Sequence, residues 1–298
     1  MTTPTAATAT AVAPAGAGRA RARRSPRRTA RRIGKGAAVA ALLVFTLFPA
    51  YFMLASAFAP RATSGIDVLL PTEFSLRHFE YVLTRAGFLT YLGNSVLVAL
   101  ITVVGSSLLA LLAAVAVARF RFRLRTTVLI LILVVQMVPL EALVISLFLL
   151  ARDLQMLNSL IGLGVVYIAL SLPFAVWMLR GFVAAVPVEV EEAAYIDGAS
   201  WGRMFWSVLF PLVAPGLVAT GIFSFITAWN EFILALTFMN DSDKYTVAVG
   251  LRQFFGQYTT DWGAVMAAST IITLPVMAFF LFVQRGLVSG LVAGAVKG

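Results

Sequence analysis

The chain has 298 residues, of which 60% are hydrophobic and only 12% are charged, and its mean hydropathy is +0.93. Soluble domains are about half apolar and about a quarter charged, so this composition excludes a soluble globular protein and indicates an integral membrane protein. Cysteine is absent and His78 is the single histidine, which excludes disulfides, thiol nucleophiles and a His/Cys metal cluster. We therefore assign no catalytic, cofactor-binding or metal-binding residue.

The first 36 residues differ in composition from the rest of the chain. They form a Thr/Ala/Pro tract that ends in RARARRSPRRTARRIGKG, and we expect a disordered basic tail because such a segment cannot bury a core. The net charge is +10, and the basic residues lie beside apolar segments. We therefore expect membrane lipid, and not nucleic acid, as a partner. A cleaved secretory signal is the alternative, because ASA at 55–57 resembles a cleavage site. The apolar stretch 37–59 is nevertheless long enough to span a membrane.

Six apolar runs of 20 or more residues predict an all-α, polytopic membrane protein with one six-helix domain over 37–298. The expected spans are 37–59, 92–118, 126–150, 158–180, 210–238 and 263–288. If both termini are cytoplasmic, 17 of the 23 Lys and Arg residues lie on the inner side. The positive-inside rule therefore selects this orientation.

Three longer segments remain outside the bilayer in this arrangement. Segments 60–89 and 239–262 face outward, and segment 181–209 faces the cytoplasm. The outer segments carry Phe74, His78, Phe79, Tyr81, Tyr245, Phe254, Phe255, Tyr258 and Trp262. These aromatic side chains could receive an extracytoplasmic partner or could lie at the headgroup level as interfacial belts.

The inner segment predicts a helix, a turn and a second helix. Pro187 and the acidic residues after it suit the first turn of a helix over about 188–196. Gly198 then ends that helix, and Ser200 can cap the next one. One face of the second helix would present Trp201, Met204, Phe205 and Val208. This shape favours docking into a groove on another protein; the alternative, an amphipathic pair on the lipid, suits acidic residues poorly beside an anionic leaflet.

This segment resembles the EAA motif of inner-membrane permease subunits of binding-protein-dependent ABC importers. The family pattern reads here as Glu192-Ala193-Ala194, Gly198 and then Val208-Leu209-Phe210-Pro211, with conservative departures at Val208 and Phe210. The resemblance extends over NSVLVAL at 94–100, LPFAVWMLRGF, AWNEF at 228–232, YTVAVGLRQF and the closing GAVKG. Together these segments are similar to carbohydrate permeases of the maltose G-subunit type over roughly 37–298.

The resemblance implies the six-helix MetI-like fold of type I importer permeases in a bacterial cytoplasmic membrane. It implies that the loop is a coupling helix seated in a cleft of a cytoplasmic ATPase. The residues that carry this role would be Glu191, Glu192, Ala193, Ala194, Asp197, Gly198 and Pro211. It also implies alternating access and import of a di- or oligosaccharide.

The expected partners are a second homologous permease, two ATPase subunits and an extracytoplasmic sugar-binding protein. No G-x-x-x-x-G-K-[ST] phosphate loop is present, so we expect ATP and Mg²⁺ on the ATPase.

Polar residues inside two spans are candidates for a sugar pathway. The fifth span carries Trp229, Asn230 and Glu231, and the third carries Gln136 and Glu141 on either side of Pro139. Amide and carboxylate groups can hydrogen-bond sugar hydroxyls, and an aromatic face can stack on the ring. The alternative is that these groups tie together helices of the two permease subunits. We also expect a kink in QMVPLE, because proline removes a helix hydrogen bond.

Other classes of function compete with this interpretation. An ion-driven secondary transporter would need a buried ion site and usually internal repeats, and no convincing repeat is visible. An ABC permease for a non-sugar solute and a membrane scaffold that binds the ATPase without transport are further alternatives. An intramembrane enzyme would be limited to a lone serine or carboxylate mechanism. The sequence does not identify the sugar.

Overall fold

The computed structural model describes residues 26–60, 73–256 and 258–295, and its contacts divide the chain into units 1–50 and 51–298. Several expectations lie outside the described residues. They are the tail up to residue 25, the basic residues Arg61 and Lys297, and the end of GAVKG.

Helix α1 (Pro26–Phe58) contains the first expected span, and its part from Gly34 to Phe58 is long and apolar enough to cross a membrane. Residues 26–36 belong to this helix, so the expectation of disorder is wrong for them. Arg, Lys and Ala are good helix formers, so the helix extends from the apolar stretch into the basic one.

The remaining described residues are almost entirely helical, with a single isolated bridge between Phe255 and Thr260 in place of a sheet. In chain order the elements are α2 (Arg77–Glu80), a π-helical turn (Tyr81–Arg85), α3 (Phe88–Arg119), α4 (Arg125–Gln136), α5 (Leu140–Asp153), α6 (Leu160–Ala185), α7 (Val188–Ile196), α8 (Trp201–Met204), a second π-helical turn (Phe205–Leu209), α9 (Phe210–Asn230), α10 (Ile233–Phe238), a 3₁₀ turn (Ser242–Lys244), α11 (Val247–Gly250), a 3₁₀ turn (Leu251–Phe254) and α12 (Trp262–Ala295).

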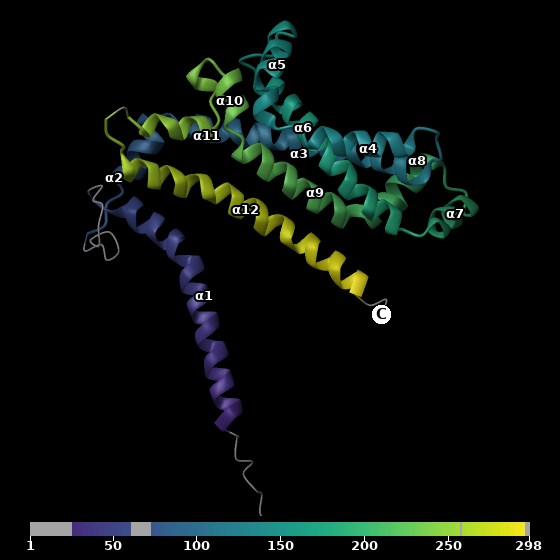
Figure 1. Ribbon diagram of the computed structural model, residues 1–298, viewed down its shortest axis with the longest axis horizontal. Helices are drawn as coiled ribbons and strands as arrows, with labels where there is room; N and C mark the ends of the chain where they lie inside the picture. Colours follow the sequence, from purple (N-terminus) through teal and green to yellow (C-terminus); the bar gives the residue numbers. More distant parts are fainter. Residues whose placement is uncertain (1–25, 61–72, 257, 296–298) are drawn as a thin grey trace, which may run out of the picture. The chain divides into compact units, whose positions relative to one another are not determined.

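Helices α3, α6 and α9 pack against one another, and α12 runs along α9 (Figure 1). Small residues allow the close approach of α3 and α6. A Cβ atom on Gly105 would lie 2.3 Å from Ile168 Cδ1, and one on Gly164 would lie 2.7 Å from Ile101 Cγ2. Small side chains at helix crossings are typical of membrane proteins, where packing replaces hydrophobic burial from water.

The third expected span is broken. Helices α4 and α5 meet at an angle of 100° across the segment Met137–Pro139 (Figure 1). The predicted kink is therefore confirmed, and it is sharp enough to divide the span into two separate helices. Pro139 lacks a backbone N–H and restricts the residue before it, so a helix cannot continue through this point. The described chain therefore has five membrane-length helices, or six if the bent pair counts as one span.

The fifth expected span, 210–238, is displaced toward the amino terminus. The membrane-length helix runs from Trp201 to Asn230 and ends at Glu231, whose backbone is extended. A short separate helix, α10, follows. The π-helical turn Phe205–Leu209 joins α8 to α9 without interruption, so the second helix of the inner segment and the fifth span are one continuous element.

Segment 239–262 is held to the ends of α3 and α6 by hydrogen bonds. Asn94 donates to the carbonyl oxygens of Asp243 and Tyr245 at 2.8 and 2.9 Å, and Lys244 Nζ donates to the Asn158 carbonyl at 2.9 Å. Phe254 is buried and packs edge to face with Tyr81. This part of the segment therefore has a structural role, whereas Tyr258 and Trp262 stay exposed.

Candidate functional site

The acidic segment forms the predicted helix and turn. Helix α7 covers Val188–Ile196, the range expected from the sequence. Gly198 follows the end of the helix and has φ of 81°. Gly198 N donates to the Tyr195 carbonyl at 3.0 Å, and Ala199 N donates to the Ala194 carbonyl at 2.9 Å. This pair of bonds is the helix-ending motif that requires a left-handed residue, for which glycine has no Cβ penalty.

The second helix begins as predicted. Ser200 Oγ accepts a hydrogen bond from Arg203 N at 3.4 Å, which confirms the cap. Met204 and Phe205 are buried within the protein together with Leu209, whereas Trp201 is 48% exposed, so the predicted face is divided between the core and the surface. The π-helical turn contains one extra residue, which shifts the buried face by one position.

We call residues 186–209 the elbow. Its buried side chains share a core with the carboxyl-terminal parts of α3 and α6. The members are Ala110, Leu111, Ala114 and Val115 from α3; Ala175, Val176, Leu179 and Val183 from α6; and Val186, Met204, Phe205, Leu209 and Val213. The elbow is therefore packed against two membrane helices and continuous with a third.

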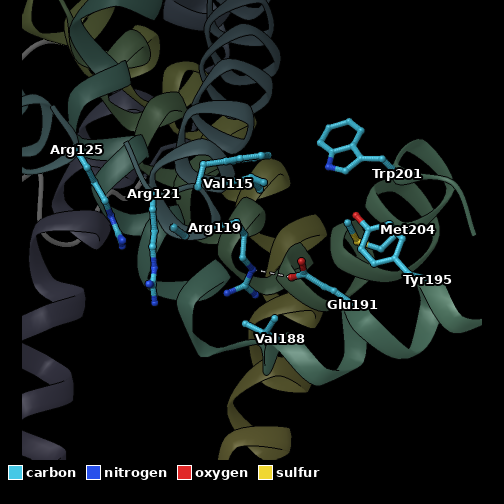
Figure 2. A pocket seen from close by; sticks show the side chains of 11 residues that line it. Val115, Arg119, Arg121, Arg125, Val188, Glu191, Tyr195, Trp201 and Met204 are labelled. Atoms are coloured by element: carbon cyan, nitrogen blue, oxygen red, sulfur yellow. Dashed lines mark hydrogen bonds and ion pairs between the residues drawn. The ribbon is translucent and has the colours of Figure 1, made fainter. Parts of the chain in front are cut away.

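Arg119, at the end of α3, fixes the elbow in place (Figure 2). Its Nε donates to Glu191 Oε1 at 2.7 Å, and its Nη2 donates to the carbonyl oxygens of Val183 and Val186 at 2.8 Å each. The two charged side chains are 13% and 9% exposed. In the sequence, Arg119 contributes only to the predicted membrane orientation, and its neighbours along the chain carry no signal for this contact.

The expected coupling residues divide into two groups. Glu191 points inward, where it is buried and bonded to Arg119. Glu192, Ala193, Asp197 and Gly198 are exposed on the elbow. Ala194 packs against the shared core, and Pro211 is exposed at the start of α9.

The structure brings together only two of the five expected sugar-pathway residues. Gln136 and Glu231 line a cavity of about 300 Å³ between the broken α4–α5 pair, α6 and α9. Tyr167 Oη, which lines the same cavity, donates to Glu231 Oε2. The carboxylate also accepts hydrogen bonds from Leu234 N at 2.8 Å and Ala235 N at 3.1 Å, so it caps α10.

The other three residues lie outside that cavity. Trp229 is 4% exposed and stacks on Phe225, with ring centroids 5.2 Å apart. Asn230 Nδ2 donates to the Ile226 carbonyl of its own helix at 3.0 Å, and Glu141 is exposed in the first turn of α5. The aromatic surface of the cavity comes instead from Phe174 and Phe223, whose rings stack at 3.8 Å.

Comparison with known proteins agrees with this architecture. Residues 106–292 match the family described as the binding-protein-dependent transport system inner membrane component. The diacetylchitobiose uptake permease DasC of Streptomyces coelicolor is 40% identical, over 90% of this chain and 98% of the relative. The trehalose transport permease SugB of Mycobacterium tuberculosis is 34% identical, over 90% and 99%. The trehalose/maltose permease MalG of Thermococcus litoralis is 36% identical, over 86% and 94%.

A solved bacterial ABC transporter involved in alginate import has the same fold, with a TM-score of 0.74, 21% identity and coverage of 88% of this chain and 98% of its own. The all-α permease fold and the family resemblance are thus confirmed. The relatives are transport components and not enzymes, and the family acts with a binding protein and other transporter subunits. The chain belongs to the family of inner membrane components of binding-protein-dependent transport systems, as a multi-pass permease subunit of the cytoplasmic membrane.

Proposed function

We propose that this chain is a permease subunit of an ATP-driven importer for a di- or oligosaccharide. The relatives named for diacetylchitobiose, trehalose and trehalose/maltose transport support the sugar class. A second homologous permease, two ATPase subunits that bind ATP and Mg²⁺, and an extracytoplasmic sugar-binding protein would complete the importer. Both termini and the elbow would lie on the cytoplasmic side, as the distribution of Lys and Arg predicts.

The observation that carries the proposal is that the elbow joins an exposed acidic surface to the membrane helices. Glu192 is exposed, while the adjacent Glu191 is paired with Arg119 at the end of α3. A force applied at Glu192 would pass to α3 through that ion pair. The same force would pass to α9 through the uninterrupted helix Trp201–Asn230.

The mechanism that follows is alternating access. Closure of the ATPase dimer would pull the elbow, and because the elbow shares a packed core with α3 and α6, these helices would rock as units. The movement would open the pathway toward the binding protein, and ATP hydrolysis would reset it. The elbow supplies the connection, and the partner subunit supplies the chemistry.

The cavity beside Glu231 would be part of the sugar pathway. Its volume of about 300 Å³ is at the lower end of ligand pockets. Gln136 would donate to or accept from sugar hydroxyls, and the stacked pair Phe174 and Phe223 would offer an aromatic face. Because Glu231 already accepts three hydrogen bonds, its role would be to hold Tyr167 and α10 around the cavity.

Charge reversal tests the docking surface. Glu192→Lys should reduce sugar-stimulated ATP hydrolysis and uptake by the assembled importer in proteoliposomes by at least about tenfold. The proposed contact would pair Glu192 with a basic group of the ATPase, and a lysine would repel that group. Glu189→Lys makes the same charge change on the same exposed helix and should retain most of the coupling. Wild-type stimulation and uptake in the Glu192 variant would contradict the proposed docking.

Substitution of Gly198 tests the shape of the elbow. A Cβ atom added to Gly198 would meet no other atom within 4 Å, so only the positive φ restricts the position. Gly198→Val should uncouple ATP hydrolysis from uptake, whereas Gly198→Asn should be tolerated because asparagine adopts the left-handed conformation more readily.

Uptake that persists after ATP depletion would instead favour an ion-driven secondary transporter.

A further inference from the structure

A pocket of about 430 Å³ lies beside the elbow, next to the ion pair of Arg119 and Glu191 (Figure 2). One wall comes from the end of α3 and the start of α4, and the other from α7 and α8. Its charged and aromatic lining residues include Arg119, Arg121, Arg125, Glu191, Tyr195 and Trp201. The pocket is therefore bounded by side chains from elements distant in sequence.

The positive charge of this pocket is not balanced. Three arginines line it, but the one acidic residue in the lining, Glu191, is paired with Arg119. Among the described residues, neither Arg121 nor Arg125 has an ion pair or hydrogen bond from its guanidinium group. Their side chains extend in the same direction in Figure 2. Two permanent positive charges thus remain available at the pocket.

We propose that this pocket binds the phosphate group of a phosphoester, held by the guanidinium groups of Arg121 and Arg125. The planar guanidinium fork matches phosphate oxygens in two-point hydrogen bonds, and two such forks would neutralise the excess charge. Tyr195 and Trp201 lie on the opposite wall, where their aromatic rings would contact the organic part of the ligand. The site is distinct from the sugar pathway and from the exposed surface of Glu192.

Two sources could supply this chemistry at the inner membrane surface. One is the headgroup of an anionic phospholipid, which is concentrated in the cytoplasmic leaflet and attracted to arginines there. The other is a soluble phosphate compound. A ligand in either case would bridge α3 and α4 to the elbow, because the pocket is lined by both.

Binding to the purified full-length chain in detergent tests the proposal. We would titrate short-chain dioctanoyl phosphatidylglycerol, inorganic phosphate and the phosphate-free dioctanoylglycerol, with tryptophan fluorescence and thermal unfolding as readouts. Saturable binding of phosphatidylglycerol is expected, with little binding of dioctanoylglycerol. Arg121→Gln and Arg125→Gln should each weaken the binding by about tenfold, the usual effect of losing one charge-assisted hydrogen bond.

Arg123→Gln provides the matched control, because Arg123 lies between the two arginines in sequence but does not line the pocket. It should leave the affinity unchanged, and the unfolding temperatures of all three variants without ligand should match the wild type. If inorganic phosphate displaces phosphatidylglycerol at millimolar concentration, the soluble source is supported; if it does not, the lipid source is supported. Equal weakening by all three variants, equal binding of dioctanoylglycerol, or no saturable binding would overturn the proposal.

Discussion

Two adjacent glutamates on α7 have opposite environments, and this difference defines the elbow at the scale of residues. Glu191 is buried and bonded to Arg119, whereas Glu192 is exposed and has no hydrogen bond or ion pair among the described residues. Successive residues of a helix point about 100° apart, so neighbours can face the core and the surface. A single acidic run therefore supplies both a buried anchor at Glu191 and an exposed carboxylate at Glu192.

The buried ion pair predicts a strongly non-additive double-mutant cycle. Removal of one partner in Arg119→Met or Glu191→Leu should lower the free energy of unfolding by about 3 kcal/mol or more, because the remaining charge stays buried without its partner. The double variant should be less destabilised than the sum of the two single variants. Denaturant unfolding in detergent measures the cycle, and strict additivity would show that the two side chains do not depend on each other.

At the scale of elements, the main feature is the close packing of α3 against α6. Gly164 on α6 lies against Ile101 of α3, and the buried hydroxyl groups of Ser106 and Ser224 form a hydrogen bond of 2.8 Å between α3 and α9. Helices that approach this closely move together when one of them is displaced. Under the proposed mechanism, a displacement of the elbow would therefore move several spans together.

Alanine substitutions in two glycines measure this packing. Gly164→Ala should lower the free energy of unfolding by about 1 to 3 kcal/mol, because its Cβ would lie 2.7 Å from Ile101 Cγ2 and force a shift. Gly93→Ala, at an exposed site of α3 with no atom within 4 Å, should be neutral or stabilising by up to about 1 kcal/mol. Similar destabilisation of both variants in detergent unfolding would contradict a role for close approach at Gly164.

At the scale of the whole molecule, the orientation in the membrane decides which surface would meet the proposed ATPase. The elbow and segment 239–262 lie at opposite ends of α9 in the chain, because α9 follows the elbow and precedes that segment. Because the helix Trp201–Asn230 that connects them is long enough to cross a membrane, we expect them on opposite sides of the bilayer. The excess of Lys and Arg predicts that the elbow lies on the inner side.

The absence of cysteine makes this orientation directly measurable. Ser242→Cys and Ser207→Cys each introduce one thiol at an exposed position, the first after α10 and the second in the elbow. A membrane-impermeant maleimide should label residue 242 in intact spheroplasts and residue 207 only in inverted vesicles. The reverse labelling pattern would place the elbow outside and remove the proposed contact with a cytoplasmic ATPase.

Much of the fold and part of the candidate site could be predicted from local sequence. The helix over 188–196, the turn at Gly198 and the cap at Ser200 follow from short-range backbone hydrogen bonding, which depends on residues a few positions apart. The break at Pro139 follows from the covalent chemistry of proline. These features need no knowledge of distant neighbours.

The sequence alone therefore determined a helical membrane protein and its family, because apolar length and helix-ending chemistry are local properties. Only the tertiary structure decided that Glu191 forms an ion pair with Arg119, which lies 72 residues away in the sequence. It also decided that Glu231 caps α10 and does not lie within a longer span. It also decided the one-residue shift that buries Leu209. The physical reason is that a buried polar group takes whichever partner the packed helices bring near, and that choice is not encoded in spacing along the chain.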